Sequence, residues 1–101
     1  MDDDILNQWD LLDMTQEDGT IDEFWCNTHL GAMGLDRSII SEFIKRFNEE
    51  LSKVKKNNPL PIKLMGRSVA NRFYYFKKID YNPILKELVR EWEIDKIIED
   101  E

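Results

Sequence analysis

Only one cysteine, Cys26, and one histidine, His29, occur in the 101 residues of this sequence. A single cysteine cannot form a disulfide within the chain, and these two residues cannot supply the four ligands of a structural zinc site. The sequence also lacks a basic leader with an apolar segment behind it, and any run of about 18 apolar residues, which a membrane-spanning helix requires. We therefore expect a cytoplasmic protein that does not enter the membrane and needs no metal or cofactor.

The four glycines are not spaced as a phosphate-binding loop requires, since neither G-x-x-x-x-G-K nor G-x-G-x-x-G occurs. Cys26 and His29 are separated by two residues, and Asp22 lies one helical turn before Cys26. A nucleophilic Cys–His pair also needs close mutual geometry and oxyanion donors, which this spacing does not supply. We interpret Cys26 as a partly buried thiol beside an imidazole on a helix surface, and we do not expect an enzyme.

Residues 17–22, with the sequence Glu-Asp-Gly-Thr-Ile-Asp, resemble the middle of an EF-hand calcium loop. Counting from Gly19, however, Met14 and Trp25 occupy the first and last ligand positions, where this family has Asp and a bidentate Glu. The sequence therefore predicts an acidic turn that leads into a capped helix.

Basic residues are missing from the first third of the chain, where ten acidic residues come before the first basic one, Arg37. The formal charge is −10 for residues 1–36, 0 for 37–50, +8 for 51–79 and −5 for 80–101, which gives the total of −7. Residues 51–79 contain no Asp or Glu. Charges of opposite sign are thus separated along the sequence, and such a pattern governs which partners a protein attracts.

Apolar residues make up 42% of the sequence, which is enough for one modest core in a chain of this length. Their spacing predicts helices over residues 4–14, over 20–33, over a long stretch that begins at Asp36 or Ser38, and after Asn82-Pro83. Residues 62–78 fit either a helix that starts at Ser68 or a small β-hairpin, and we favour the helix. We expect a mainly α single domain of residues 1–101, a compact bundle of about four to five helices, with an α+β fold as the alternative.

The long helix has the clearest apolar period. The residues of this stripe are Ile40, Phe43, Ile44, Phe47, Leu51 and Val54. In the helix before it, Thr20 fits an N-cap, and the apolar side would carry Ile21, Phe24, Trp25 and Ala32. We expect Trp9, Trp25 and Trp92 in the core; on the surface, they would serve as anchors for a partner.

We interpret the acidic first third as the binding surface of a small non-enzymatic protein, an inhibitor or regulatory factor that engages a basic protein partner. Clustered like charge opposes folding and therefore suggests a use outside the fold. The candidate partner-binding residues are Asp2, Asp3, Asp4, Asp10, Asp13, Glu17 and Asp18.

Residues 63–78 support an alternative, because cations alternate with aromatic residues there and a short helix would follow Gly66. The segment resembles the second half of a helix-turn-helix, which implies a regulator that binds DNA or RNA through this helix. Its candidate contacts are Lys63, Arg67, Ser68, Asn71, Arg72, Tyr75 and Lys78. A third hypothesis is a homodimer in which Ile94, Ile97 and Ile98 pack against a second copy.

Overall fold

The computed structural model describes residues 4–99 of the chain, with side chains from Asp4 to Ile94. The elements follow in the order α1 (Gln8–Met14), α2 (Glu23–Ala32), α3 (Arg37–Asn57), the 3-10 helix η1 (Ile62–Leu64), α4 (Ser68–Phe76) and α5 (Tyr81–Glu99). No strand occurs within residues 4–99, where Thr15 and Ile21 form an isolated antiparallel bridge. The predicted mainly α fold is confirmed, and residues 62–78 contain η1 and α4 in place of the alternative β-hairpin.

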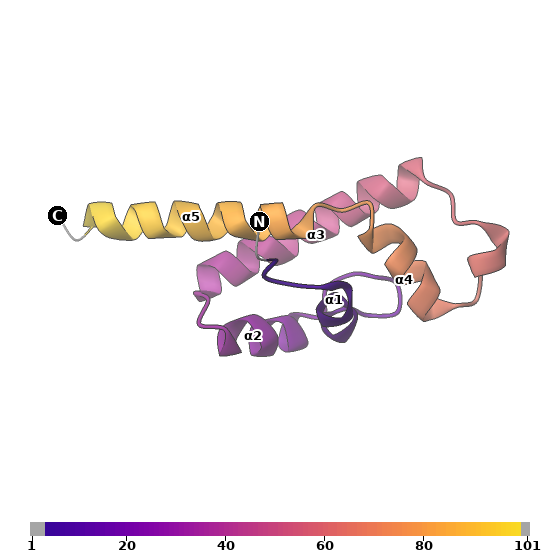
Figure 1. Ribbon diagram of the computed structural model, residues 1–101, viewed down its shortest axis with the longest axis horizontal. Helices are drawn as coiled ribbons and strands as arrows, with labels where there is room; N and C mark the ends of the chain where they lie inside the picture. The colour runs from indigo at the N-terminus through magenta and orange to yellow at the C-terminus, as the bar shows by residue number, and fades with distance from the viewer. Residues whose placement is uncertain (1–3, 100–101) are drawn as a thin grey trace.

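Helix α3 is the longest helix and lies at the centre of the molecule (Figure 1). It contacts α2, α4 and α5, whereas α1 contacts α2 and α4. Asp36, one of the two predicted caps, is the N-cap of α3. The molecule measures 56 × 26 × 24 Å because α5 projects beyond the other helices. None of the helices within the described residues combines the length and the apolar character of a membrane span.

The core is built around one face of α3, as the apolar period predicts. The buried residues of this helix are Ile39, Ile40, Phe43, Phe47, Leu51 and Val54. Ile44, which was expected in the same stripe, is partly buried and packs against the core. The rings of Phe47 and Phe76, with centroids 5.9 Å apart, join α3 to α4, and Leu85 and Leu88 join α5 to the same cluster. The described helices therefore share one core and form a single compact domain.

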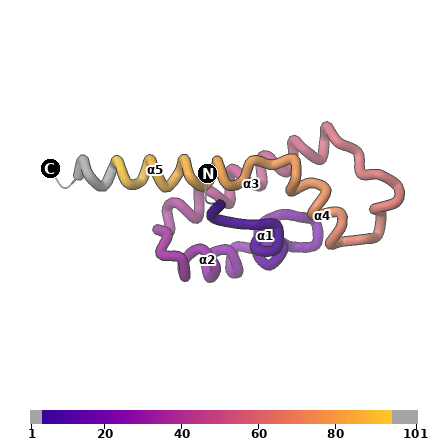
Figure 2. Tube along the Cα trace, in the orientation of Figure 1, coloured from indigo at the N-terminus to yellow at the C-terminus, as the bar shows by residue number. Residues whose placement is uncertain are grey.

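The side chain of Asn82 fixes the N-terminal segment to the start of α5, where the two tubes lie side by side in Figure 2. Its Oδ1 atom accepts a hydrogen bond from Leu6 N (2.8 Å), and its Nδ2 atom donates one to Leu6 O (2.7 Å). Because the backbone of Leu6 is engaged in this way, α1 begins only after its N-cap, Asn7, and the predicted start at residue 4 is wrong. Asn82 is also not an N-cap, since α5 begins at Tyr81.

Helix α2 starts later than the sequence predicted. Its N-cap is Asp22 and not Thr20, which bonds instead to the Asp18 carboxylate in the preceding turn. Ile21, expected on the apolar side of this helix, lies before its first residue. It forms an antiparallel bridge with Thr15 and donates its N–H to Asn48 Oδ1 (2.9 Å). The acidic turn itself is confirmed.

The buried face of α2 also differs from the predicted one. Cys26 and Leu30 point into the core, whereas Phe24 and Trp25 lie on the outside. The prediction that Phe24 and Trp25 form the apolar side against the core is therefore wrong. Cys26 and Leu30 lie one helical turn apart, and Phe24 and Trp25 are adjacent in the sequence, so two apolar faces are available and only the packing of α2 against α3 decides between them.

Candidate protein-binding surface on helices α1 and α2

The predicted acidic site residues that fall within the described part of the chain lie on and around α1. They are Asp4 before the helix, Asp10 and Asp13 on it, and Glu17 and Asp18 in the turn that leads to α2, whereas Asp2 and Asp3 lie outside the described residues. Asp13 and Glu17 are exposed, and the salt bridges between described side chains involve neither of them. Their negative charges are therefore available to a partner.

Asp10 and Asp18 stabilise the fold around this surface. The Asp10 carboxylate accepts a hydrogen bond from Asn7 N (2.9 Å) in the capping box of α1 and lies 3.6 Å from His29 Nε2. The Asp18 carboxylate accepts hydrogen bonds from the hydroxyl and the N–H of Thr20, and these bonds, the hydroxyl first, lower the pKa of Asp18. Both residues therefore position the helices as well as contribute charge.

An exposed aromatic pair lies on the outer face of α2, next to these acids. Phe24 is 68% exposed and Trp25 55%, and their ring centroids are 5.1 Å apart in an edge-to-face arrangement. Two large apolar side chains that touch each other and remain in solvent are a common feature of protein interfaces, where aromatic anchors carry much of the binding energy. The acidic residues Asp22 and Glu23 come directly before the pair in the sequence.

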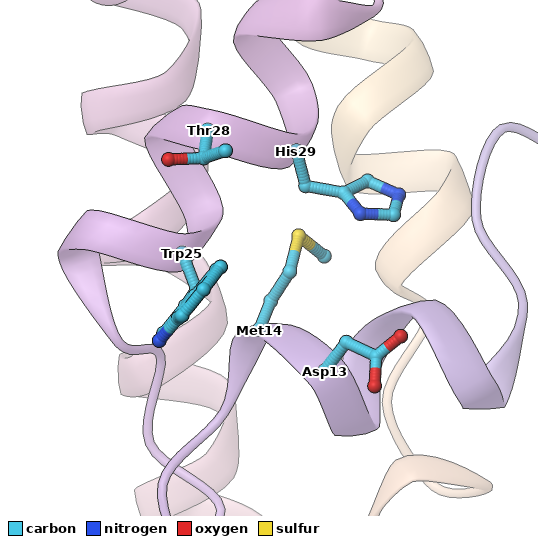
Figure 3. Close-up of a pocket in the computed structure, with 5 residues that line it drawn as sticks. All are labelled: Asp13, Met14, Trp25, Thr28 and His29. Atoms are coloured by element: carbon cyan, nitrogen blue, oxygen red, sulfur yellow. The ribbon is translucent and has the colours of Figure 1, made fainter.

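A pocket of about 370 Å³ lies between α1 and α2 beside this pair. Figure 3 shows Met14 of α1 in the middle, with Trp25 on one side and Asp13 and His29 on the other; Thr28 completes the lining. The indole of Trp25 offers an apolar surface, Met14 is buried beneath the pocket, and the carboxylate of Asp13 supplies a negative charge at the edge. The pocket is thus suited to a long side chain with an apolar stem and a cationic end.

A second hollow, of about 580 Å³, lies on the other side of Phe24 and is lined also by Glu23, Asn27 and Arg37. Thr28 lines both hollows, so that they adjoin across the outer face of α2. We call the surface formed by these two hollows the α1–α2 surface; it includes Phe24, Trp25 and the acidic residues Asp13 and Glu23.

The alternative nucleic-acid site is partly engaged within the fold, because Arg72 links α4 to the end of α1. Its Nη1 atom donates hydrogen bonds to Thr15 O (3.3 Å) and Leu12 O (3.5 Å), and its Nη2 atom donates one to Ser68 Oγ (3.2 Å). A cation at the C-terminal carbonyls of a helix is favourable for that helix. Arg72 and Ser68 therefore have a structural role.

The other residues of the alternative site are spread over η1, α4 and the adjoining loops. Lys63, Arg67 and Lys78 are exposed, and Tyr75 is partly buried against the core. Asn71 is partly buried, and its Oδ1 atom has no hydrogen-bond partner. The structure thus leaves the three cations accessible but does not gather all seven residues on one face.

Cys26 lies in the core and not at a reactive surface. Burial raises the pKa of the Cys26 thiol to about 12, so that the thiolate is essentially absent at neutral pH. Asp22 caps α2, and His29 faces Asp10, so the three residues have separate surroundings. Within the described residues, no group of three or more His, Cys, Asp and Glu side chains is arranged to hold a metal ion.

The expectation that the tryptophans lie in the core is wrong for Trp9 and Trp25, which are exposed, whereas Trp92 packs partly against the core. The sequence contained one sign of the α1–α2 surface, since Cys26 and Leu30 offer a second apolar face that leaves Phe24 and Trp25 outside. Comparison of the chain with protein-family models found no match, and comparisons with curated proteins and with solved structures found none either.

Proposed function

We propose that the protein is a non-enzymatic protein-binding module, an inhibitor or regulatory factor that engages a basic protein through its α1–α2 surface. The observation that carries this proposal is the exposed pair of Phe24 and Trp25, with the uncompensated carboxylate of Asp13 in the same pocket as Trp25. Aromatic anchors supply affinity at such interfaces, and surrounding charge of one sign speeds the approach of an oppositely charged partner.

The pocket between α1 and α2 suggests how the partner is recognised. The aliphatic part of a lysine or arginine side chain would lie against Trp25, while its cationic end would reach the carboxylate of Asp13. Contact of a cation with an indole face adds a further attraction of about 0.5–2 kcal/mol, depending on how far water is excluded. Binding should therefore depend on both the aromatic and the acidic residues.

Affinity capture with matched baits tests this function. One bait is the unaltered protein, a second carries Phe24→Ser and Trp25→Ser, and a third carries Ile62→Ser and Met65→Ser, which change equally exposed side chains elsewhere. We expect basic proteins that are retained by the first and third baits and lost from the second. Retention of the basic proteins by all three baits, or loss of acidic proteins alone from the second bait, would contradict the proposal.

Calorimetry with the captured partner then separates the two contributions. Trp25→Ser should weaken binding by about tenfold or more, and Asp13→Asn should weaken it less and reduce its dependence on salt. Glu17→Gln is the matched control, since it removes the same charge outside the pocket. If Asp13→Asn and Glu17→Gln behave alike, the pocket does not hold a cation.

The alternative function, a regulator that binds DNA or RNA, has less support. Lys63, Arg67 and Lys78 are exposed, but Arg72 and Ser68 are engaged in contacts within the fold. The homodimer also stays a prediction: Ile94 is exposed, and the side chains of residues 97 and 98 lie outside the described part of the chain.

A further inference from the structure

Another pocket, which shares no lining residue with the two hollows of the α1–α2 surface, lies between η1 and α4. It has a volume of about 460 Å³, and its apolar lining includes Leu64, Phe73 and Tyr74. Lys63 and Lys77 contribute to the same lining. The pocket therefore combines an apolar floor with two positive charges.

The apolar character continues outside the pocket onto exposed side chains. Ile62 is 84% exposed and Met65 60%, and Val69 lies one helical turn before Phe73 on α4, where it is also exposed. Trp9 of α1 is also exposed and packs edge-to-face on Phe73 of the pocket lining, with the ring centroids 5.1 Å apart. We call this surface, from Trp9 across the pocket to Ile62 and Met65, the η1–α4 surface.

The local backbone explains why these side chains are exposed. η1 contains only three residues and none of them is buried, so this short helix contributes no side chain to the core. Pro61 comes before it, and Gly66, with φ of 78°, turns the chain back towards α4. Exposed apolar patches on a protein of this size usually mark an interaction site, since solvent alone gives no reason to retain them.

The charge around the η1–α4 surface is positive. Residues 51–79 contain no acidic residue, Lys63 and Lys77 line the pocket, and Arg67 and Lys78 are exposed close by in the sequence. A partner that covers this surface should therefore have apolar side chains for the pocket and acidic side chains for its edges.

We propose that the η1–α4 surface binds an acidic amphipathic helix of a partner protein, with its apolar side in the pocket and its carboxylates near Lys63 and Lys77. A helical segment fits this pattern because its apolar residues recur on one side and its charges on the other. The site is separate from the α1–α2 surface and does not depend on the function proposed for that surface. The two surfaces would bind partners of opposite charge.

The observations favour a protein over a nucleic acid at this site. Phosphate binding rests on the placement of cations, but Arg72 is directed to the carbonyls of α1, and Lys78 Nζ lies 4.9 Å from the centroid of the Tyr74 ring, where a base would stack. The apolar floor of the pocket and the exposed Ile62 and Met65 would be left uncovered by a phosphate backbone, which could use only the two lysines.

Two phage-displayed peptide libraries test the proposal. Both use peptides of about 16 residues, or some four helical turns, with randomised apolar residues on one side; the other side carries Glu in one library and Lys in the other. Mixed-sequence single-stranded and duplex DNA serve as further probes at physiological salt. We expect enrichment from the Glu library that is lost when the bait carries Ile62→Ser with Met65→Ser, and no binding of DNA. Absence of enrichment from the Glu library would overturn the proposal, as would Lys-library peptides that are lost with the same two substitutions, or DNA binding that exceeds peptide binding.

Variants place the enriched peptides on the surface. Ile62→Ser with Met65→Ser, and separately Lys63→Gln with Lys77→Gln, should each weaken binding of the best peptide by about tenfold. These residues contribute little to the core, and thermal unfolding monitors the fold. The controls are Phe24→Ser, an exposed apolar residue of the α1–α2 surface, and Lys53→Gln, an exposed cation on α3. Equal weakening by the controls would place the peptide elsewhere and overturn the proposal.

Discussion

Replacing Asn82 with alanine should destabilise the protein strongly, because one side chain satisfies both backbone groups of a residue distant in sequence. Asn82 accepts a hydrogen bond from Leu6 N and donates one to Leu6 O, and both residues are buried. The substitution leaves a buried N–H and a buried C=O without these partners. It therefore removes the link between the N-terminal segment and α5 and leaves two desolvated polar groups unpaired.

The magnitude follows from those two groups. A buried donor or acceptor without a partner costs about 1–3 kcal/mol, so that the Asn82→Ala variant, with two such groups, should lose about 2–6 kcal/mol in its free energy of unfolding. For a domain of this size, each kcal/mol corresponds to a decrease in Tm of about 4–8 °C. Domains of this kind have total stabilities of about 5–15 kcal/mol, so the loss is easily measured.

The Asn82→Asp variant adds a pH dependence with a definite sign. In the natural protein, Asn82 Nδ2 donates a hydrogen bond to Leu6 O (2.7 Å). An ionised Asp side chain can still accept a hydrogen bond from Leu6 N, but its second oxygen takes the place of Nδ2 and has no hydrogen to donate to Leu6 O. The protonated acid restores a donor there, so folding raises the pKa of the introduced group above its unfolded value of about 3.9. The negative charges of Asp4 and Asp10 should add to this shift. The pKa of neighbouring Tyr81 is raised mainly by burial and, to a smaller extent, by these two carboxylates. An acid with a raised folded pKa is most stabilising at low pH and loses that contribution as the pH rises.

Urea unfolding of the natural protein and of both variants, at neutral pH and near pH 4, measures these differences. We expect the deficit of Asn82→Asp to become smaller at the lower pH and that of Asn82→Ala to stay nearly constant. The reasoning is refuted if Asn82→Ala loses less than about 1 kcal/mol, or if the deficit of Asn82→Asp grows as the pH falls.

Three further outcomes follow from the described contacts. Cys26 should resist thiol reagents at pH 8 in the native protein and react fully in urea, because burial raises its pKa to about 12; rapid native labelling would contradict its position in the core. Arg72→Met should lower the free energy of unfolding by about 1–2 kcal/mol in urea titrations through loss of the bonds to α1, and an unchanged midpoint would contradict that link. Asp22→Ala should cost about 1 kcal/mol and Asp22→Asn much less, as expected for an N-cap; equal effects would argue against capping.

The helical fold could be predicted because α3 is covered by other helices along one face and its apolar residues recur with a helical period. The face of α2 could not be predicted, since the sequence offers two apolar pairs and only the packing of α2 against α3 decides which pair is buried. Distant polar contacts, such as that of Asn82 with Leu6, also leave no pattern in the sequence.

The candidate sites, too, could be predicted only in part. The separation of acidic from basic residues is visible in the sequence, and the five of the seven proposed acids that the structure describes lie on and around α1. What the sequence cannot show is which charges remain free. Arg72 looks like any other surface cation until the carbonyls of Thr15 and Leu12 are placed beside it.

The arrangement of charge along the long axis has a consequence for the approach of partners. The end of α3, η1 and α4 lie at one end of the molecule, and they contain the segment without acidic residues, whereas α2 and the projecting part of α5 lie towards the other end (Figure 1). The protein therefore has a large electric dipole moment along its length of 56 Å. In the field of a charged partner it would turn before contact, so that an acidic protein meets the η1–α4 end first and a basic protein meets the opposite side. Added salt should remove this orientation and slow both encounters, while leaving the apolar contacts unchanged.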